Sequence, residues 1–180
     1  NVDAETSKLV QFQIDQVDRL TSLVRTLLEM SNLQSVSRSD EIELAPLIDE
    51  ILTDLTTLAE QKNITLHQNC EDVHMIGSDT LIYRLLFNLI ENAIKYNHSG
   101  GSVTVSMQQE NQQVLLHIAD TGCGIPEEYR ESIFQPFFRV DKSRSRQMGG
   151  VGLGLALVRE IAVLHGGSVC VESGSKDGTT

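Results

Sequence analysis

The sequence has no tryptophan, few other aromatic residues and little positive charge. Aromatic residues make up 4% of its 180 positions, a scarcity that argues against a stacking platform for single-stranded nucleic acid. Fourteen lysines and arginines stand against 25 acidic residues, and the formal net charge is −11. Because a phosphate backbone attracts a basic surface, this balance argues against nucleic acid as the main partner.

Paired cysteines and long apolar runs are also missing. Cys70, Cys123 and Cys170 are odd in number and form no CxxC pair, which argues against a disulfide framework or a zinc ribbon and fits a reducing cytosol. The longest apolar stretch, Leu81 to Ile90, is interrupted by polar residues and is shorter than the ~20 residues that span a bilayer. The first residues are polar, unlike a secretory signal. We therefore expect a soluble chain with one core and no membrane-spanning segment.

The N-terminal segment, Ser7 to Leu33, has the pattern of one long helix. Apolar side chains recur at heptad spacing and at the positions between: Val10, Val17, Leu20, Val24 and Leu27. A helix with so much apolar surface needs a neighbour. That neighbour is either a partner helix in a bundle, which we favour, or the domain that follows in the chain.

A polar break at Ser35 to Asp40 precedes a mixed α and β pattern. The predicted elements are a strand at Glu41 to Leu44, a helix opened by Pro46 with a stripe from Leu47 to Leu58, a strand at Ile64 to Leu66, a helix capped by Ser78 and running to Asn97, a hairpin of Val103 to Val105 and Val114 to Ile118 across Gln108 to Gln113, a helix from Gly152, and a last strand at Ser168 to Glu172. This order predicts an α+β fold: a two-layer α/β sandwich with helices on one face of a mixed sheet, preceded by the long helix.

The helix from Ser78 to Asn97 carries the first candidate site. Asn88, Asn92 and Lys95 fall within about 60° of one another on its surface, and Arg84 and Glu91 flank them. A carboxamide oxygen suits a magnesium ion that phosphates already hold, and a lysine supplies charge for those phosphates. The alternative is an ordinary solvated polar face.

Two glycine-rich segments form the other candidates. Asp120 ends a predicted strand before two glycines, where a carboxylate can accept a hydrogen bond from an exocyclic amine such as that of adenine. The segment Phe134 to Leu155 has a basic cluster followed by glycines at a helix start, which together suit an anionic ligand under a mobile lid. It has no GK[ST] and follows no strand, so it is neither a P-loop nor a Rossmann motif. The alternatives are a glycine turn and a solubilising surface loop.

In this order the segments resemble the boxes of the sensor histidine kinases. The run Asn88 to Tyr96 resembles the N box, and Asp120 to Pro126 resembles the first glycine box. Further along the chain, Phe134 to Arg139 resembles the F box, Gly150 to Leu155 the second glycine box, and Gly178 with Thr179 the last glycine box. The N-terminal helix, with Asp18-Arg19-Leu20, is similar to the second helix of the family's dimerisation and phosphotransfer hairpin.

The resemblance implies a Bergerat fold that binds ATP and Mg²⁺, with the hairpin helix at 1–38 and the catalytic ATP-binding domain at 39–180. It implies that Asn92 coordinates the metal, that Asn88 lies beside the phosphates and that Asp120 reads adenine. The remaining residues implied for the pocket, the lid and its closing loop are Lys95, Tyr96, Gly122, Gly124, Arg139, Arg144, Gly150, Gly152, Leu153, Gly154, Leu155 and Thr179. It also implies catalytic roles for Asn88, Lys95, Arg139 and Arg144.

The phosphate-accepting histidine of that family is expected outside this chain. The family needs a histidine followed by an acidic residue on the first hairpin helix, and none of the five is followed by Asp or Glu: His67, His74, His98, His117 and His165. We expect a fragment that begins after the acceptor and does not phosphorylate itself. The resemblance implies further partners, namely the acceptor hairpin, a response-regulator receiver domain and a second copy in a homodimer, and a cytoplasmic place in a membrane-anchored sensor kinase.

Three other functions remain open. Bergerat-fold ATPases of the gyrase and chaperone type carry a glutamate base where this chain has Asn88, and Glu91 is expected to point away by about 60° to 100°. Serine kinases of the anti-sigma kind share the N box but lack the long helix. A binding module without catalysis would keep the boxes intact. Cys123, between two pocket glycines, is expected to be a variable position rather than a redox switch.

Overall fold

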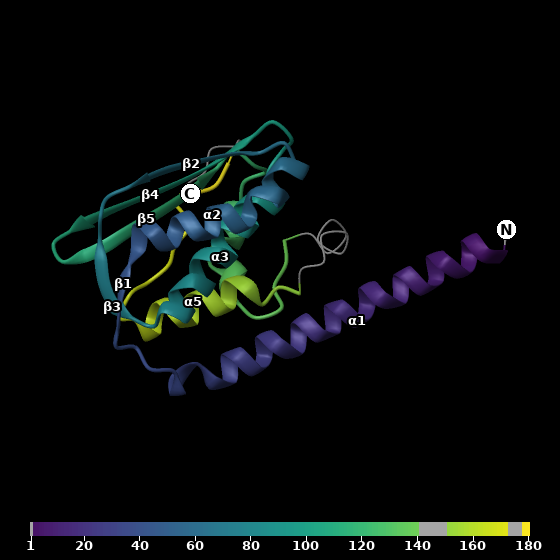
Figure 1. Ribbon diagram of the computed structural model, residues 1–180, viewed down its shortest axis with the longest axis horizontal. Helices are drawn as coiled ribbons and strands as arrows, with labels where there is room; N and C mark the ends of the chain where they lie inside the picture. Colours follow the sequence, from purple (N-terminus) through teal and green to yellow (C-terminus); the bar gives the residue numbers. More distant parts are fainter. Residues whose placement is uncertain (1, 141–150, 173–177) are drawn as a thin grey trace.

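The long N-terminal helix projects away from the rest of the molecule. The computed structural model describes residues 2–140, 151–172 and 178–180. Helix α1 spans Val2–Asn32, and a short 3₁₀ turn, η1, follows at Leu33–Ser35 (Figure 1). Its last turn and the residues after it pack on the domain, where Leu33 joins a small core cluster with Leu81, Leu157 and Ile161. The apolar stripe before that point stays exposed.

Two sheets follow, and the larger one is mixed. Strands β1 (Asp40–Glu43) and β3 (His74–Gly77) pair antiparallel. Strands β2 (Thr65–Cys70), β4 (Ser102–Glu110) and β5 (Gln113–Asp120) lie in the order β2-β4-β5, with β2 parallel to β4 and β4 antiparallel to β5. Asn111 and Gln112 both have positive φ, so a two-residue turn joins β4 to β5 and the loop is shorter than predicted.

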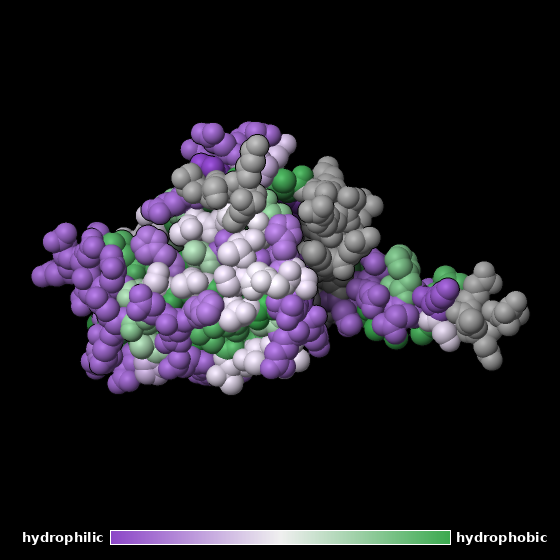
Figure 2. All heavy atoms as spheres, turned by 90° about the horizontal axis from the view of Figure 1, so that it is seen from above, coloured by the Kyte–Doolittle hydropathy of each residue, from purple (hydrophilic) through white to green (hydrophobic). Residues whose placement is uncertain are grey.

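Three helices cover one face of the mixed sheet (Figure 1). They are α2 (Leu44–Gln61), α3 (Asp79–Lys95) and α5 (Gly154–Leu164), and short 3₁₀ turns η2 (Glu127–Tyr129) and η3 (Ser132–Phe134) lie between. The core between the layers is filled by Ile48, Ile51, Ile90, Ile94, Val103 and Val105, each fully or almost fully buried. Figure 2, which views the side of the sheet away from the helices, shows mostly hydrophilic and near-neutral residues. The predicted two-layer α/β sandwich is confirmed.

Local signals explain where α3 begins. The side chain of Ser78 accepts a hydrogen bond from the backbone N–H of Leu81, as predicted for the N-cap. His165 supports the same end, since its Nε2 accepts from the N–H of Ser78 at 3.1 Å. Within residues 2–140, 151–172 and 178–180, no helix is long and apolar enough to cross a membrane.

Three local predictions were wrong. Pro46 is the third residue of α2, not the first, and causes no break because the first N–H groups of a helix lack partners inside it. Strand β3 was not predicted. Ser168 to Glu172 is irregular rather than a strand: Thr179 bridges to Asp120 of β5, and Glu172 donates to the carbonyl of Thr180 at 2.8 Å.

Candidate functional site

A cavity of about 780 Å³ lies beside the exposed face of α3. Its walls come from α3, the end of β5, the segment after β5, η3, the start of α5 and the chain end at Thr179. The sequence-predicted boxes, far apart along the chain, therefore surround one space. Three residues of α1 also line it: Ser22, Arg25 and Thr26.

Helix α3 presents Asn88, Asn92 and Lys95 to this cavity, as its periodicity predicts, and Tyr96, directly after the helix, lines it too. The side-chain amide of Asn88 donates to the carbonyl of Arg84 at 2.7 Å. The Asn88 Oδ1 atom then faces the start of α5, because a Cβ placed on Gly154 would stand 2.9 Å from it. Two boxes whose contacting residues, Asn88 and Gly154, are 66 positions apart thus meet at the Asn88 carboxamide.

Glu91 also lines the cavity, although it was expected to point about 60° to 100° away from Asn88 and Asn92. Its Oε1 lies 2.9 Å from the Nζ of Lys95, one helical turn later. The two side chains are about one quarter exposed, and they form a close ion pair at the cavity wall. The Lys95 ammonium is therefore paired with a carboxylate of its own helix at the cavity wall.

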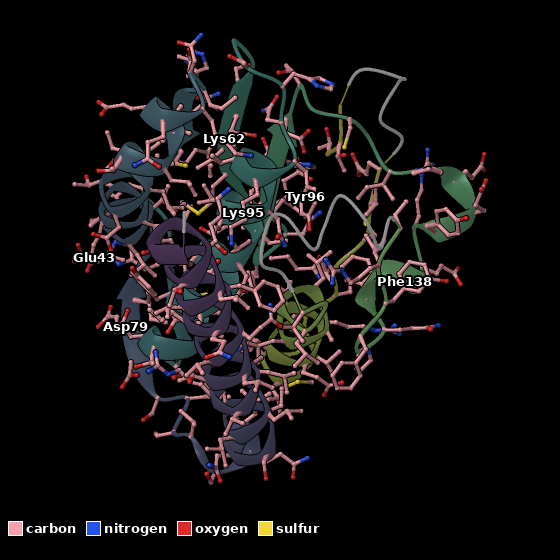
Figure 3. All side chains as sticks on the ribbon, turned by 90° about the vertical axis from the view of Figure 1, so that its right-hand side faces the viewer. Glu43, Lys62, Asp79, Lys95, Tyr96 and Phe138 are labelled. Carbon is pink, nitrogen blue, oxygen red and sulfur yellow. The ribbon has the colours of Figure 1, made fainter. Side chains whose placement is uncertain are left out.

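Lys62, at the C-terminal end of α2, holds the end of α3 in place. Its Nζ donates to the backbone carbonyl of Lys95. Burial, and secondly the charge of Lys95, lower the pKa of Lys62. This contact links two helices and could not be predicted from either helix alone. Figure 3 shows Lys62, Lys95 and Tyr96 on the same side of the molecule, with Phe138 on a separate segment.

Asp120, the last residue of β5, also lines the cavity. Its Oδ1 accepts from the N–H of Gly122 at 2.7 Å, and its backbone exchanges hydrogen bonds with Thr179 at 2.8 and 3.2 Å. Burial raises the pKa of the Asp120 carboxyl, and the hydrogen bond from Gly122 opposes part of that rise. A fixed, partly buried carboxylate of this kind suits an amine donor on a ligand.

Two glycines of the boxes are required by close contacts. A Cβ on Gly122 would stand 2.5 Å from the carbonyl oxygen of Tyr96. Gly152 has φ of +81°, and a Cβ there would stand 2.7 Å from the carbonyl oxygen of Phe138. The glycines therefore let the chain turn tightly against α3 and against the segment after η3.

Arg139 reaches the cavity from the segment after η3. It lines the wall, and its Nη2 is buried with no hydrogen-bond partner among the described residues. A buried guanidinium nitrogen without a partner suits an anionic group of a ligand. Arg144 and Gly150, the other predicted residues of this segment, lie outside the described residues.

Gly124, Gly152, Leu153, Gly154, Leu155 and Thr179 all line the cavity as predicted. Gly122 is buried against α3 and does not line the cavity.

Six further apolar residues of the cavity wall were not predicted: Phe87, Ile118, Ile125, Ile133, Phe134 and Phe138. Most of these lie within or next to the boxes, but apolar spacing alone cannot separate a ligand wall from core. The cavity thus offers a carboxylate, apolar groups, amides, cations and glycine backbone, a combination that fits a nucleotide.

Comparison with known proteins agrees with this arrangement. Residues 77–180 match the family described as histidine kinase-, DNA gyrase B-, and HSP90-like ATPase. The sensor histidine kinase RppB of Synechocystis sp. is 34% identical over 96% of this chain and 40% of its own length. The chain spans less than half the length of the curated relatives first matched.

Solved structures show the same likeness. The mycobacterial sensor histidine kinase MprB superposes with a TM-score of 0.69 at 28% identity, over 78% of this chain and 92% of that one. Histidine kinase ThkA in complex with response regulator protein TrrA gives 0.73 at 25% identity, over 92% and 47%. Together with the cavity, these likenesses show that the chain belongs to the histidine kinase-, DNA gyrase B- and HSP90-like ATPase family, as an ATP-binding catalytic domain of its histidine kinase branch.

Proposed function

We propose that this chain transfers the γ-phosphoryl group of ATP to a histidine of an acceptor hairpin, for relay to an aspartate of a response regulator. The observation that carries the proposal is that Asn88, Asn92, Lys95 and Asp120 all line one cavity. Phosphoryl transfer requires mainly positioning and charge neutralisation, and these residue types supply both. The relatives and ThkA, whose complex contains a response regulator, support the same reaction.

Each residue then has a role in holding Mg²⁺-ATP. Asn92 coordinates the metal through its carboxamide oxygen, and Asn88 lies beside the phosphates. Asp120 accepts the adenine amine, next to the turn at Gly122. Arg139, together with Arg144 of the lid, neutralises phosphate charge. The described residues contain no cluster of three His, Cys, Asp or Glu side chains, so the metal in this proposal is held by one amide and the phosphates.

The long helix belongs to the acceptor hairpin in this proposal, with 1–38 as its second helix and 39–180 as the catalytic domain. The exposed stripe on α1 supports pairing with a second copy, and the whole protein is a homodimer in the cytoplasmic part of a membrane-anchored sensor. Replacing Leu20 and Leu27 with Glu is expected to turn a sedimenting dimer into a monomer. A wild-type chain that already sediments as a monomer would contradict self-pairing through α1.

A calorimetric titration with ATP, with and without Mg²⁺, tests the site. We expect binding that Mg²⁺ strengthens, that Asn92→Ala weakens at least about tenfold and that Asp120→Asn abolishes. Asn69→Ala, on the exposed strand β2, is the matched control and leaves affinity unchanged. A metal-independent affinity that ignores Asn92→Ala would remove the proposed ligand.

Hydrolysis of ATP is the second candidate, because Glu91 lines the cavity. Its carboxylate is held by Lys95 at 2.9 Å, and Asn88 occupies the position of the base in the ATPases. Steady turnover that Glu91→Gln abolishes would favour hydrolysis. We expect no turnover and no acid-labile phosphate on the chain itself.

A further inference from the structure

Arg84 stands between the nucleotide cavity and a second space. It lies on α3 one turn before Asn88 and lines the nucleotide cavity. It also lines an apolar groove of about 930 Å³ between α1 and the helices α3 and α5. No box of the family resemblance includes this residue.

Glu29 of α1 holds the Arg84 guanidinium with both carboxylate oxygens. Nε donates to Oε2 at 3.2 Å, and Nη2 lies 3.1 Å from each oxygen. Among the described residues it is the one ion pair that joins α1 to the domain. The side chains are 37% and 33% exposed, so the pair is screened by water and easily exchanged.

The turn of α3 that carries Arg84 is connected to the phosphate end of the site. The carbonyl of Arg84 accepts from the Asn88 amide at 2.7 Å, and Asn88 Oδ1 faces Gly154 at the start of α5. Arg84 therefore lies one helical turn before Asn88, whose carboxamide faces the glycine box. Asn92, Asn88 and Arg84 thus follow one another at intervals of one turn along α3, and all three line the cavity.

We propose that Arg84 binds the terminal phosphate of ATP and that Glu29 competes with that phosphate for it. The guanidinium fork that binds two carboxylate oxygens also binds two phosphate oxygens, and the phosphate carries the larger charge. Nucleotide binding thus loosens the ion pair between α1 and α3. The proposal rests on the ATP site proposed above and adds a residue and a regulatory contact to it.

Comparing ATP with ADP by calorimetry on the whole chain tests the role of Arg84. We expect Arg84→Gln to weaken ATP about tenfold and ADP less than about twofold, because only ATP has the terminal phosphate. Arg84→Lys keeps the charge but loses the two-pronged guanidinium, so it is expected to restore only part of the preference for ATP. Equal losses for ATP and ADP would show that Arg84 is only structural, and unchanged affinities would exclude contact.

A double-mutant cycle tests the competition. Glu29→Gln is expected to tighten ATP binding about two- to fivefold in the wild-type background and to have no effect beside Arg84→Gln. Asp18→Asn removes the same charge from an exposed part of α1 and leaves ATP affinity unchanged. The same gain in both backgrounds, or with Asp18→Asn, would overturn competition. A wild-type chain that binds neither nucleotide would overturn the ATP site as well, whereas binding with an unchanged ATP preference in Arg84→Gln overturns this inference alone.

Discussion

Helix α1 exposes most of its apolar side chains, whereas the domain that follows buries its own. Leu20 and Val17 on α1 are each 60% exposed, whereas Ile90 and Ile94 on α3 are fully buried. Burying such a side chain contributes about 1.5–3 kcal/mol, so the domain obtains its stability from within itself. The stripe on α1 gains nothing comparable from this chain. The difference teaches that the domain buries its apolar side chains in a core of its own, whereas most of the apolar stripe on α1 has no such cover among the described residues.

The largest expected effect comes from shortening one apolar side chain to alanine in each region and comparing the free energies of unfolding. Ile90→Ala opens a cavity in the closed core and is expected to cost about 2–5 kcal/mol of unfolding free energy. Leu20→Ala is expected to change it by less than about 0.5 kcal/mol, since the side chain is already in water. Urea unfolding of the dilute chain measures both. Similar losses would mean that α1 is packed in solution.

Glycine positions provide the next comparison, within the domain. Gly122→Ala places a Cβ 2.5 Å from the backbone oxygen of Tyr96 and is expected to cost about 1–3 kcal/mol and to weaken ATP binding. Gly167→Ala meets only the Ala162 oxygen at 3.5 Å, an ordinary contact, and is the control. Thermal unfolding and nucleotide titration report the two effects. A Gly122→Ala chain as stable as Gly167→Ala would refute the tight fit.

Two serine hydroxyls allow the same comparison, one at the start of α3 and one within α1. Ser78→Ala removes the buried N-cap of α3 and is expected to cost about 1 kcal/mol. Ser22 on α1 donates only to the carbonyl of Asp18 in its own helix, so Ser22→Ala is expected to be neutral within a few tenths of a kcal/mol. Chemical unfolding of both variants checks this. A larger loss at Ser22 would show that α1 contributes to the stability of the isolated chain.

Much of this architecture could be predicted because its signals are local. The heptad stripe predicted α1, Ser78 predicted the start of α3, and alternation predicted the hairpin of β4 and β5. Strand β3 was missed because its four residues offer too little alternation. The prediction at Ser168 to Glu172 was wrong because partner choice at a sheet edge depends on the whole chain.

The functional site likewise has parts that local sequence patterns predict and parts that they do not. Periodicity placed Asn88 and Asn92 on one face of α3, and strand alternation placed Asp120 at a strand end. The contacts of Lys62 with Lys95 and of Glu29 with Arg84 join elements distant in sequence. No local pattern specifies such pairs, because either partner could equally face water.

The smallest expected effect concerns the charge of Asp120. Its pKa is raised by burial above the ordinary value of 3.8, so the folded chain binds this proton more tightly than the unfolded chain. As the pH rises from 3.8 through the folded pKa, the unfolded state ionises first and the folded state loses relative stability. At neutral pH the buried carboxylate therefore costs free energy.

Asp120→Asn removes that cost, and its Oδ1 can still accept from Gly122. We expect the variant to be more stable than wild type at pH 7 by less than about 1 kcal/mol, because the site is only partly shielded from water. The gain should vanish below pH 3.8, where the wild-type carboxyl is protonated in both states. Asp18→Asn on exposed α1 should give no such pH-dependent gain. Urea midpoints between pH 3 and 8 measure both variants, and a destabilised Asp120→Asn at pH 7 would mean that the carboxylate stabilises the fold as well as binding the ligand.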